Sequence, residues 1–207
     1  MKKYNENLKL LSQNHIYSNE MEHDACGIGL IASTEGKKSR KVVDYGIEAL
    51  KAVWHRGAVD ADGKTGDGAG IHLEIPKDFF IEKIQVTGHD YDESEICVGM
   101  IFLPRNDYSA QESSKTIVES ELTKSNFSIY GWRQVPVNPK VLGEKAFQTM
   151  PEIIQVLFKS NDPDLLDKDL ERKIYETRKK IEIKADNLSL NDFYVCSMSS
   201  KSIIYKG

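Results

Sequence analysis

The sequence has few cysteines and no long apolar run. Three cysteines occur among 207 residues, and none has the Cys-x-x-Cys spacing of a zinc site. Such a small, odd set predicts reduced thiols and a cytoplasmic protein. No stretch approaches the roughly 20 apolar residues that a membrane helix needs. No apolar core follows Met1–Lys3, so no secretory signal is expected.

An excess of basic charge is also lacking. The chain carries 28 Lys and Arg against 32 Asp and Glu, a net charge of −4. This balance predicts neither nucleic acid nor an anionic membrane as a partner. Hydrophobic residues make up 40% of the chain, and the length suffices for one globular domain with a sizeable core.

Hydrophobic periodicity predicts alternating strands and helices. Val43, Ile47, Leu50 and Trp54 recur at helical spacing, whereas residues 71–75 alternate as in a half-buried strand. The expected helices are 40–54, a short one from Pro76 through Phe80, 108–124 and 166–187. The expected strands are 26–32, 71–75, 96–103, 127–137, 152–158, 193–198 and 202–205.

Cys26 stands out among the three cysteines. It comes at the end of Glu-His-Asp-Ala-Cys (22–26) and before Gly-Ile-Gly-Leu-Ile-Ala, at the start of the strand expected over 26–32. Glycines beside a thiol let a substrate approach closely. Residues 1–25 are polar and patternless, as in a removable leader, and cleavage before Cys26 would give this residue a free α-amine. Cys97 and Cys196 lie inside apolar runs and are assigned to the core.

A second informative region reads His-Arg-Gly-Ala-Val-Asp-Ala-Asp (55–62) and Thr-Gly-Asp-Gly-Ala-Gly-Ile (65–71). A phosphate-binding loop is excluded because residue 58 is alanine where that loop needs glycine. An EF-hand calcium loop is excluded because Thr65 stands at its sixth position. The glycine spacing also misses the dinucleotide fingerprint by one residue. The region is expected to form a tight loop near the nucleophile. His55 and Arg56 could instead cap the end of the preceding helix.

Together these motifs resemble one family. The order of Asp-Ala-Cys-Gly-Ile-Gly, His-Arg-Gly-Ala and Thr-Gly-Asp-Gly-Ala-Gly-Ile is similar to the amino-terminal glutamine amidotransferase domain of glutamate synthase large subunits. Three later segments fit the same family: 75–80, 131–137 and 194–200. The resemblance covers nearly the whole chain. It implies an α+β fold of the N-terminal-nucleophile hydrolase type, an αββα sandwich of which the first half is present.

The resemblance also implies a site and a reaction. Cys26 would attack the side-chain amide of L-glutamine, with its own α-amine as the base. Support for the nucleophile or the substrate is expected from Arg56, Gly27, Gly66, Asp67 and Gly68. No metal or cofactor is expected in this segment. FMN and an iron–sulfur cluster are implied for the complete enzyme, with the remainder of that chain and its small subunit or electron donor as partners.

The sequence departs from the family near its end. No Asn-Gly pair for an oxyanion hole occurs in the 207 residues, and the Arg-bearing segment that would grip the substrate carboxylate is also missing. Residues 26–207 are therefore expected to be the amino-terminal part of the domain. Two alternatives remain open at this point: a catalytically incomplete fragment or glutamine-sensing module, and another class II amidotransferase, such as a phosphoribosyl or glucosamine relative.

Overall fold

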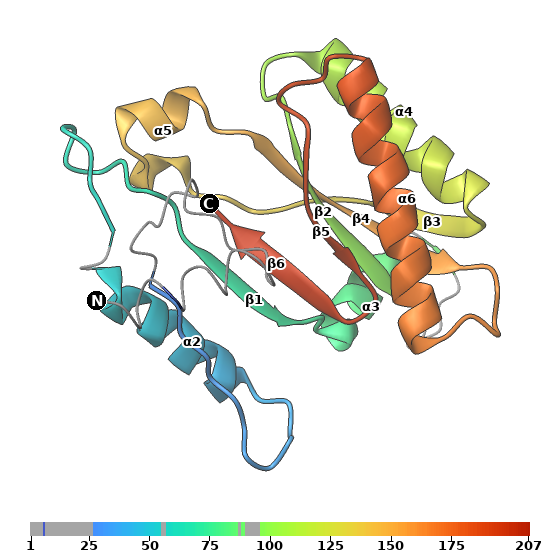
Figure 1. The fold of residues 1–207 in the computed structure, drawn as a ribbon, viewed down its shortest axis with the longest axis horizontal. Coiled ribbons are helices and arrows are strands. Elements are labelled where there is room, and N and C mark those ends of the chain that lie inside the picture. The colour runs from blue at the N-terminus through green and yellow to red at the C-terminus, as the bar shows by residue number, and fades with distance from the viewer. Residues whose placement is uncertain (1–5, 7–26, 55–56, 87, 90–95) are drawn as a thin grey trace.

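Two antiparallel sheets form the centre of the protein (Figure 1). The computed structural model describes residues 6, 27–54, 57–86, 88–89 and 96–207. The larger sheet has the order β3-β4-β2-β5, and the smaller sheet pairs β1 with β6. The larger sheet contains β2 (Cys97–Leu103), β3 (Phe127–Gln134), β4 (Glu152–Ser160) and β5 (Tyr194–Ser199), and the smaller contains β1 (Gly70–Glu74) and β6 (Ser202–Lys206).

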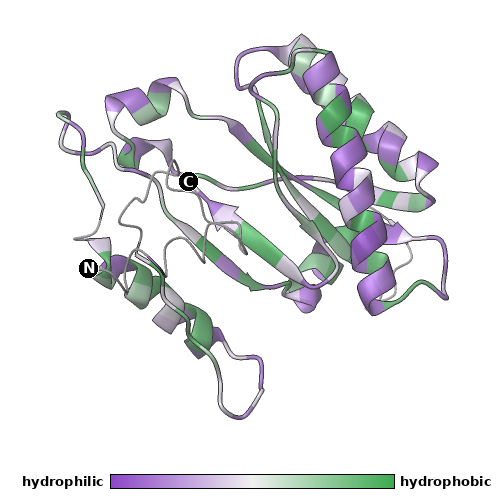
Figure 2. Cartoon of the chain, in the orientation of Figure 1, coloured by the Kyte–Doolittle hydropathy of each residue, from purple (hydrophilic) through white to green (hydrophobic). Residues whose placement is uncertain are grey.

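Two long helices cover one face of the larger sheet. They are α4 (Tyr108–Lys124) and α6 (Asp167–Asn187). Side chains alternate between the faces of a strand, and in β2 the residues Cys97, Ile101 and Leu103 point into the core beneath these helices. Apolar colour in Figure 2 follows the strands, while α6 is largely polar on the side toward the viewer. The helices thus bury one apolar stripe each against the sheet.

The smaller sheet lies on the opposite face of the larger one. There Val98 and Met100 of β2 join Ile203 of β6 in a second core, which is completed by α3 (Lys77–Val86). The buried members from α3 are Phe80, Ile81 and Ile84. The two cores thus join three layers: the helices α4 and α6, the larger sheet and the smaller sheet.

Helix α2 (Arg40–Ala52) borders the smaller sheet and has no fully buried residue. Ser39 begins it by accepting a hydrogen bond from Lys41 N, as N-cap residues do. The Ile71 side chain approaches α2 at Gly46, where an added Cβ would lie 3.4 Å from Ile71 Cδ1. Two short helices, η3 (Pro139–Val141) and α5 (Glu144–Gln148), lie between β3 and β4 in the chain.

The predicted α+β class is confirmed as a mixture of helices and antiparallel sheets. The helix predicted over 108–124 has those bounds. The helix predicted from Pro76 is longer than expected and continues to Val86. The strand predicted over 127–137 ends at Gln134, close to Pro136, which has no N–H to donate to a ladder.

The strand predicted over 26–32 is wrong for residues 27–32, which form neither strand nor helix. Their side chains are exposed to solvent: Ile28 is 91% and Leu30 is 90% exposed. A strand exists only where a neighbouring strand takes up its backbone hydrogen bonds, and among the described residues no strand pairs with this stretch. Cys26 itself lies outside the described residues.

Candidate active site

The two residues on which the predicted chemistry depends most, Cys26 and Arg56, lie outside the described residues. Two residues close to them in the chain, Gly27 and Val53, are described and lie in contact. A Cβ atom added to Gly27 would lie 2.9 Å from Val53 Cβ, closer than real Cβ contacts come. Glycine is therefore required where the chain after position 26 crosses the end of α2. Val53 stands three positions before Arg56.

The glycine-rich region forms a hairpin, defined here as residues 57–69. Val59 and Gly66 make an isolated antiparallel bridge. Asp67 closes the base of the hairpin, because its Oδ2 accepts a hydrogen bond of 2.7 Å from Ala58 N. The loop is tight, as predicted, and Asp67 holds the backbone two positions after Arg56. The predicted nearness of this loop to the nucleophile concerns Cys26, which lies outside the described residues.

Gly68 sits where the hairpin enters β1. Its φ is +92°, a region that glycine adopts and residues with a Cβ rarely do. A Cβ at this position would lie 2.7 Å from the carbonyl oxygen of Gly207. That oxygen accepts a hydrogen bond of 2.7 Å from Ala69 N, and Gly207 N donates to Ala69 O at 2.9 Å. Gly68 therefore allows the smaller sheet to continue past β6.

A buried polar contact links the two sheets near this region. Gln155 of β4 is fully buried, and its Oε1 accepts a hydrogen bond of 2.8 Å from Arg133 Nη1. Its Nε2 donates to Tyr205 Oη of β6 at 3.4 Å. The Arg133 guanidinium also lies 5.0 Å from the Phe79 ring centroid, within the range of a cation–π contact.

Sequence reasoning missed Gln155. It also missed Asp62 and Gly143, which meet at the tip of the hairpin, where a Cβ on Gly143 would lie 2.3 Å from Asp62 Oδ2. The signal for Gln155 was a lone amide inside the apolar run of residues 152–158, because a polar group in a buried strand needs a partner. The signal for Asp62 was an aspartate two positions before a lysine and three before a threonine, a pattern typical of side-chain-capped turns. Nothing local marked Gly143, whose importance depends on a residue far away in the sequence.

The other two cysteines lie in the core, as predicted. Cys97 is fully buried and Cys196 is 6% exposed, and they belong to the two different cores. Burial raises the pKa of the Cys196 thiol. No group of three or more His, Cys, Asp or Glu side chains that could hold a metal ion occurs in the described part of the chain.

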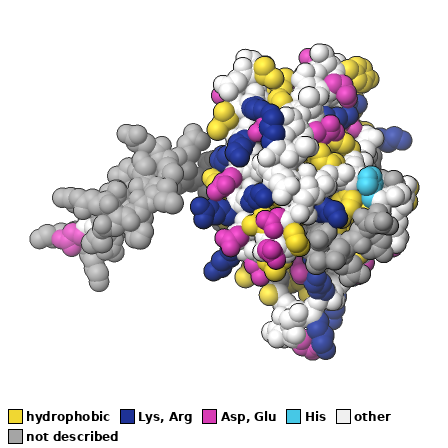
Figure 3. Space-filling model, turned by 90° about the vertical axis from the view of Figure 1, so that its right-hand side faces the viewer, with side chains coloured by type: hydrophobic (Ala, Val, Ile, Leu, Met, Phe, Trp, Pro, Cys, Tyr) yellow, Lys and Arg dark blue, Asp and Glu magenta, His cyan; other side chains and the backbone are white. Residues whose placement is uncertain are grey.

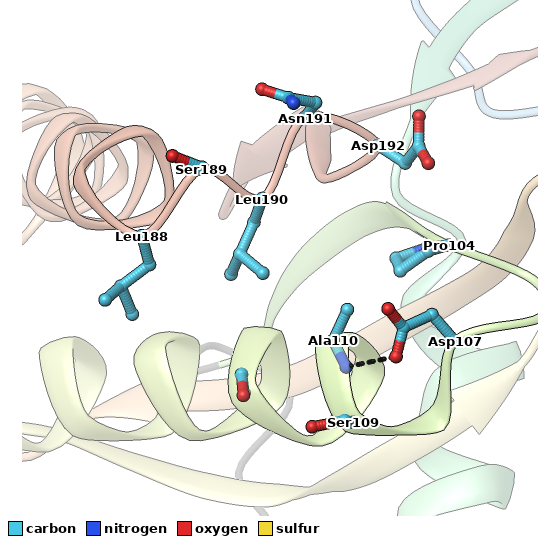
Figure 4. A pocket seen from close by; sticks show the side chains of 10 residues that line it. Pro104, Asp107, Ser109, Ala110, Leu188, Ser189, Leu190, Asn191 and Asp192 are labelled. Atoms are coloured by element: carbon cyan, nitrogen blue, oxygen red, sulfur yellow. Dashed lines mark hydrogen bonds between the residues drawn. The ribbon is translucent and has the colours of Figure 1, made fainter.

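A shallow cavity of about 400 Å³ lies away from these residues, between the start of α4 and the turn after α6 (Figure 4). Asp107 faces it, but Asp107 Oδ1 already accepts the N-capping hydrogen bond of 2.9 Å from Ala110 N. The hairpin contributes no side chain to this cavity. Its lining residues are Pro104, Asp107, Ser109, Ala110, Ser113, Leu188, Ser189, Leu190, Asn191 and Asp192.

Charges of both signs alternate on the surface at the α4 and α6 side (Figure 3). Several of them pair along α6, as Arg178 does with Glu182 at 2.7 Å. Glu121 of α4 is buried and receives hydrogen bonds from Lys124 and Lys184. The described helices include none that combines the length and the apolar character of a membrane span.

Comparison with known proteins identifies the family. The family model for class II glutamine amidotransferases matches residues 26–207. The glutamate synthase [NADPH] large chain of Azospirillum brasilense is 51% identical over 201 residues, which are 97% of this chain and 13% of that protein. The first residue of the family match is Cys26, the residue singled out by its flanking sequence.

Ferredoxin-dependent enzymes are also similar. The ferredoxin-dependent glutamate synthase of Pyropia yezoensis is 38% identical over 96% of this chain and 13% of its own length. The chloroplastic ferredoxin-dependent glutamate synthase of Spinacia oleracea is 39% identical over 90% of this chain and 12% of its own length. The chain thus spans about an eighth of the relatives that it matches, and it belongs to the class II glutamine amidotransferase family.

Proposed function

We propose that residues 26–207 are the amino-terminal part of the glutaminase domain of a glutamate synthase. The family match over these residues and the 51% identity to a glutamate synthase large chain support this assignment. Residues 1–25 are a leader whose removal exposes Cys26 as the amino-terminal residue. The match to the family model begins at the same residue, which supports that boundary.

The layers of the fold support the N-terminal-nucleophile hydrolase assignment. Helices α4 and α6, the larger sheet, the smaller sheet and then α2 follow one another through the molecule. We take this order as support for an αββα sandwich. In this proposal the smaller sheet and the α2 layer are incomplete within residues 26–207, since α2 has no fully buried residue.

The chemistry follows from the thiol and the amine on one residue. A cysteine thiol has a reference pKa of about 8.5 and an α-amine one of about 7.7 to 8.0, so the amine can accept the thiol proton near neutral pH. The Cys26 sulfur attacks the δ-carbon of L-glutamine, and the C–N bond breaks as the amine returns that proton to the leaving ammonia. Water then hydrolyses the thioester and releases glutamate.

The contact between Gly27 and Val53 is the observation that carries the site assignment. It joins the chain next to Cys26 to the end of the helix that leads to Arg56. In the proposal Arg56 fixes the surroundings of the nucleophile by charge-assisted hydrogen bonds. Gly66, Asp67 and Gly68 shape the hairpin that follows, through the bridge, the Asp67 hydrogen bond and the close approach of Gly207.

The cofactors and partners of a complete synthase belong to other parts of it. Cys97 and Cys196 lie in separate cores and cannot ligate one iron–sulfur cluster together, so the described residues do not fit that group. FMN and the cluster would serve the part that uses the ammonia to aminate 2-oxoglutarate. We further propose that its partners are the remainder of the synthase chain and a small subunit or electron donor. The proposed location is the cytoplasm.

The test is the replacement Cys26→Ala in the full-length gene product. Glutamine-dependent glutamate formation should be lost, because no nucleophile remains. Formation from added ammonia should persist, since ammonia bypasses the thioester. Cys97→Ala is the matched control and should keep both activities, because its thiol is buried in the core. Equal loss of both activities in Cys26→Ala would refute the assignment.

A further inference from the structure

The tip of the hairpin is built around Asp62. Asp60 N donates to Thr65 O at 2.8 Å, and Gly63 N donates to Asp60 O at 2.9 Å. Asp62 Oδ1 accepts from Lys64 N at 2.9 Å and from Thr65 N at 2.7 Å. Its Oδ2 accepts from Thr65 Oγ1 at 2.6 Å. The carboxylate therefore organises the whole turn.

The Asp62 carboxylate also lies against a distant part of the chain. A Cβ added to Gly143, the residue before α5, would lie 2.3 Å from Asp62 Oδ2. The hydrogen bonds within the turn, with that from the Thr65 hydroxyl first, hold the pKa of the Asp62 carboxyl well below its usual range. The tip of the hairpin thus sits at the amino end of α5, although Gly143 comes 81 residues after Asp62 in the sequence.

Gly143 makes this approach possible. It is buried although its neighbours in the sequence are exposed or half-buried. A Cβ at this position would lie 2.2 Å from Thr65 Oγ1 and 2.3 Å from Asp62 Oδ2. Its φ of −73° suits any residue, so only the contact excludes a side chain there. Lys145 adds a second link, because its Nζ lies 2.5 Å from Asp60 Oδ2.

This contact holds a segment that otherwise has little packing. Within residues 57–69, Asp60 and Thr65 are half-buried and the others are exposed. The base of the hairpin carries Asp67 and Gly68, which contact Ala58 and Gly207. A hairpin without a core keeps its position only through contacts at its two ends.

We infer that Asp62 and Gly143 are positioning residues for the glutaminase site. The contact between them, named here the tip contact, fixes the hairpin that carries Asp67 and Gly68. This inference rests on the proposed function, in which those residues shape the surroundings of the nucleophile. Catalysis requires reacting groups to be held closely, and a displacement of about 1 Å costs on the order of 100-fold in rate.

The test uses Gly143→Ala in the full-length gene product. The added methyl group should displace the hairpin tip and lower kcat for glutamine-dependent glutamate formation by on the order of 100-fold. Ammonia-dependent activity should be unchanged, and amide hydrogen exchange should rise within residues 57–69 alone. Asp62→Asn, which removes the charge at constant size, should lower kcat in the same direction by a smaller factor.

Two control variants change exposed side chains beside the tip contact. Lys64→Ala leaves in place the backbone N–H that donates to Asp62, and Glu144→Ala leaves Gly143 unchanged next to it in the chain. Both variants should keep full activity. Wild-type glutamine-dependent kcat in Gly143→Ala, with hydrogen exchange raised in the hairpin, would overturn the inference. Loss of both activities together would also overturn it, because the contact would then serve the fold as a whole. Neither result touches the proposed function, which is tested separately by Cys26→Ala.

Discussion

Replacement of Gly68 by alanine tests how closely the hairpin and the smaller sheet are joined. Two separate obstacles meet at this position. The backbone has φ +92°, and an added Cβ would lie 2.7 Å from Gly207 O. Because that oxygen belongs to the paired backbone of Ala69 and Gly207, it cannot move away without loss of hydrogen bonds.

The expected cost has two parts. A residue with a Cβ in left-handed backbone geometry costs about 1–2 kcal/mol. Loss of the two hydrogen bonds between Ala69 and Gly207 adds about 0.5–1.5 kcal/mol each. Gly68→Ala should therefore lower the free energy of unfolding by about 2–5 kcal/mol. Gly36→Ala is the matched control, with φ +66° and no atom within 4 Å of the added Cβ, and should cost about 1–2 kcal/mol.

Urea unfolding followed by circular dichroism measures both variants. The midpoint should fall further for Gly68→Ala than for Gly36→Ala, with equal slopes, since a change in midpoint alone reports stability. Hydrogen exchange of the Ala69 amide should rise in Gly68→Ala only. Equal midpoints in the two variants, with Ala69 still protected, would refute the close approach of Gly207.

Three further predictions concern charge and thiols. Arg56→Lys should lose glutamine-dependent activity nearly as fully as Arg56→Ala, because lysine lacks the planar fork of guanidinium; restored activity in an enzyme assay would favour a helix-capping role. The hydrogen bond from Lys184 lowers the pKa of Glu121 from its ordinary value of 4.5. The ionised Glu121 carboxylate therefore stabilises the folded protein above pH 4.5, and this stabilisation is lost as the pH falls through the lower pKa of the folded state. Glu121→Gln should therefore be less stable than wild type at neutral pH, with the gap in urea midpoint closing below about pH 4.5; a gap independent of pH would contradict this. Cys97 and Cys196 are buried and should resist iodoacetamide in the folded chain and react after unfolding, as mass spectrometry would show; rapid labelling of either in the native chain would count against its place in the core.

Elements whose ends are set by contacts close in the sequence could be predicted, whereas elements that need a distant partner could not. The helix over 108–124 was predicted with its bounds, and a local contact accounts for its start, because Asp107 caps α4 through Ala110 N. The stretch 27–32 has the composition of a buried strand, yet a strand needs a partner that composition does not reveal. Tyr130 is the extra residue of a bulge between Ile129 and Gly131, inside a strand that ends at Gln134 instead of the predicted residue 137.

The residues of the candidate site also fall into those that local motifs mark and those that depend on distant contacts. The motifs marked Asp67 and Gly68, and the structure gives both a physical role at the base of the hairpin. Gly143 could not be found, because a glycine is informative only when the atoms that crowd it are known. Asp62 was weighed as part of a calcium loop, whereas both of its carboxylate oxygens accept hydrogen bonds from its own turn.

Mass spectrometry of the full-length gene product, quenched in acid during turnover of L-glutamine, tests the central claim most directly. The account predicts a mature protein that begins at Cys26 and carries a γ-glutamyl thioester on that residue, with Cys97 and Cys196 unmodified. Active protein that retains residues 1–25, or an adduct on another cysteine, would contradict it.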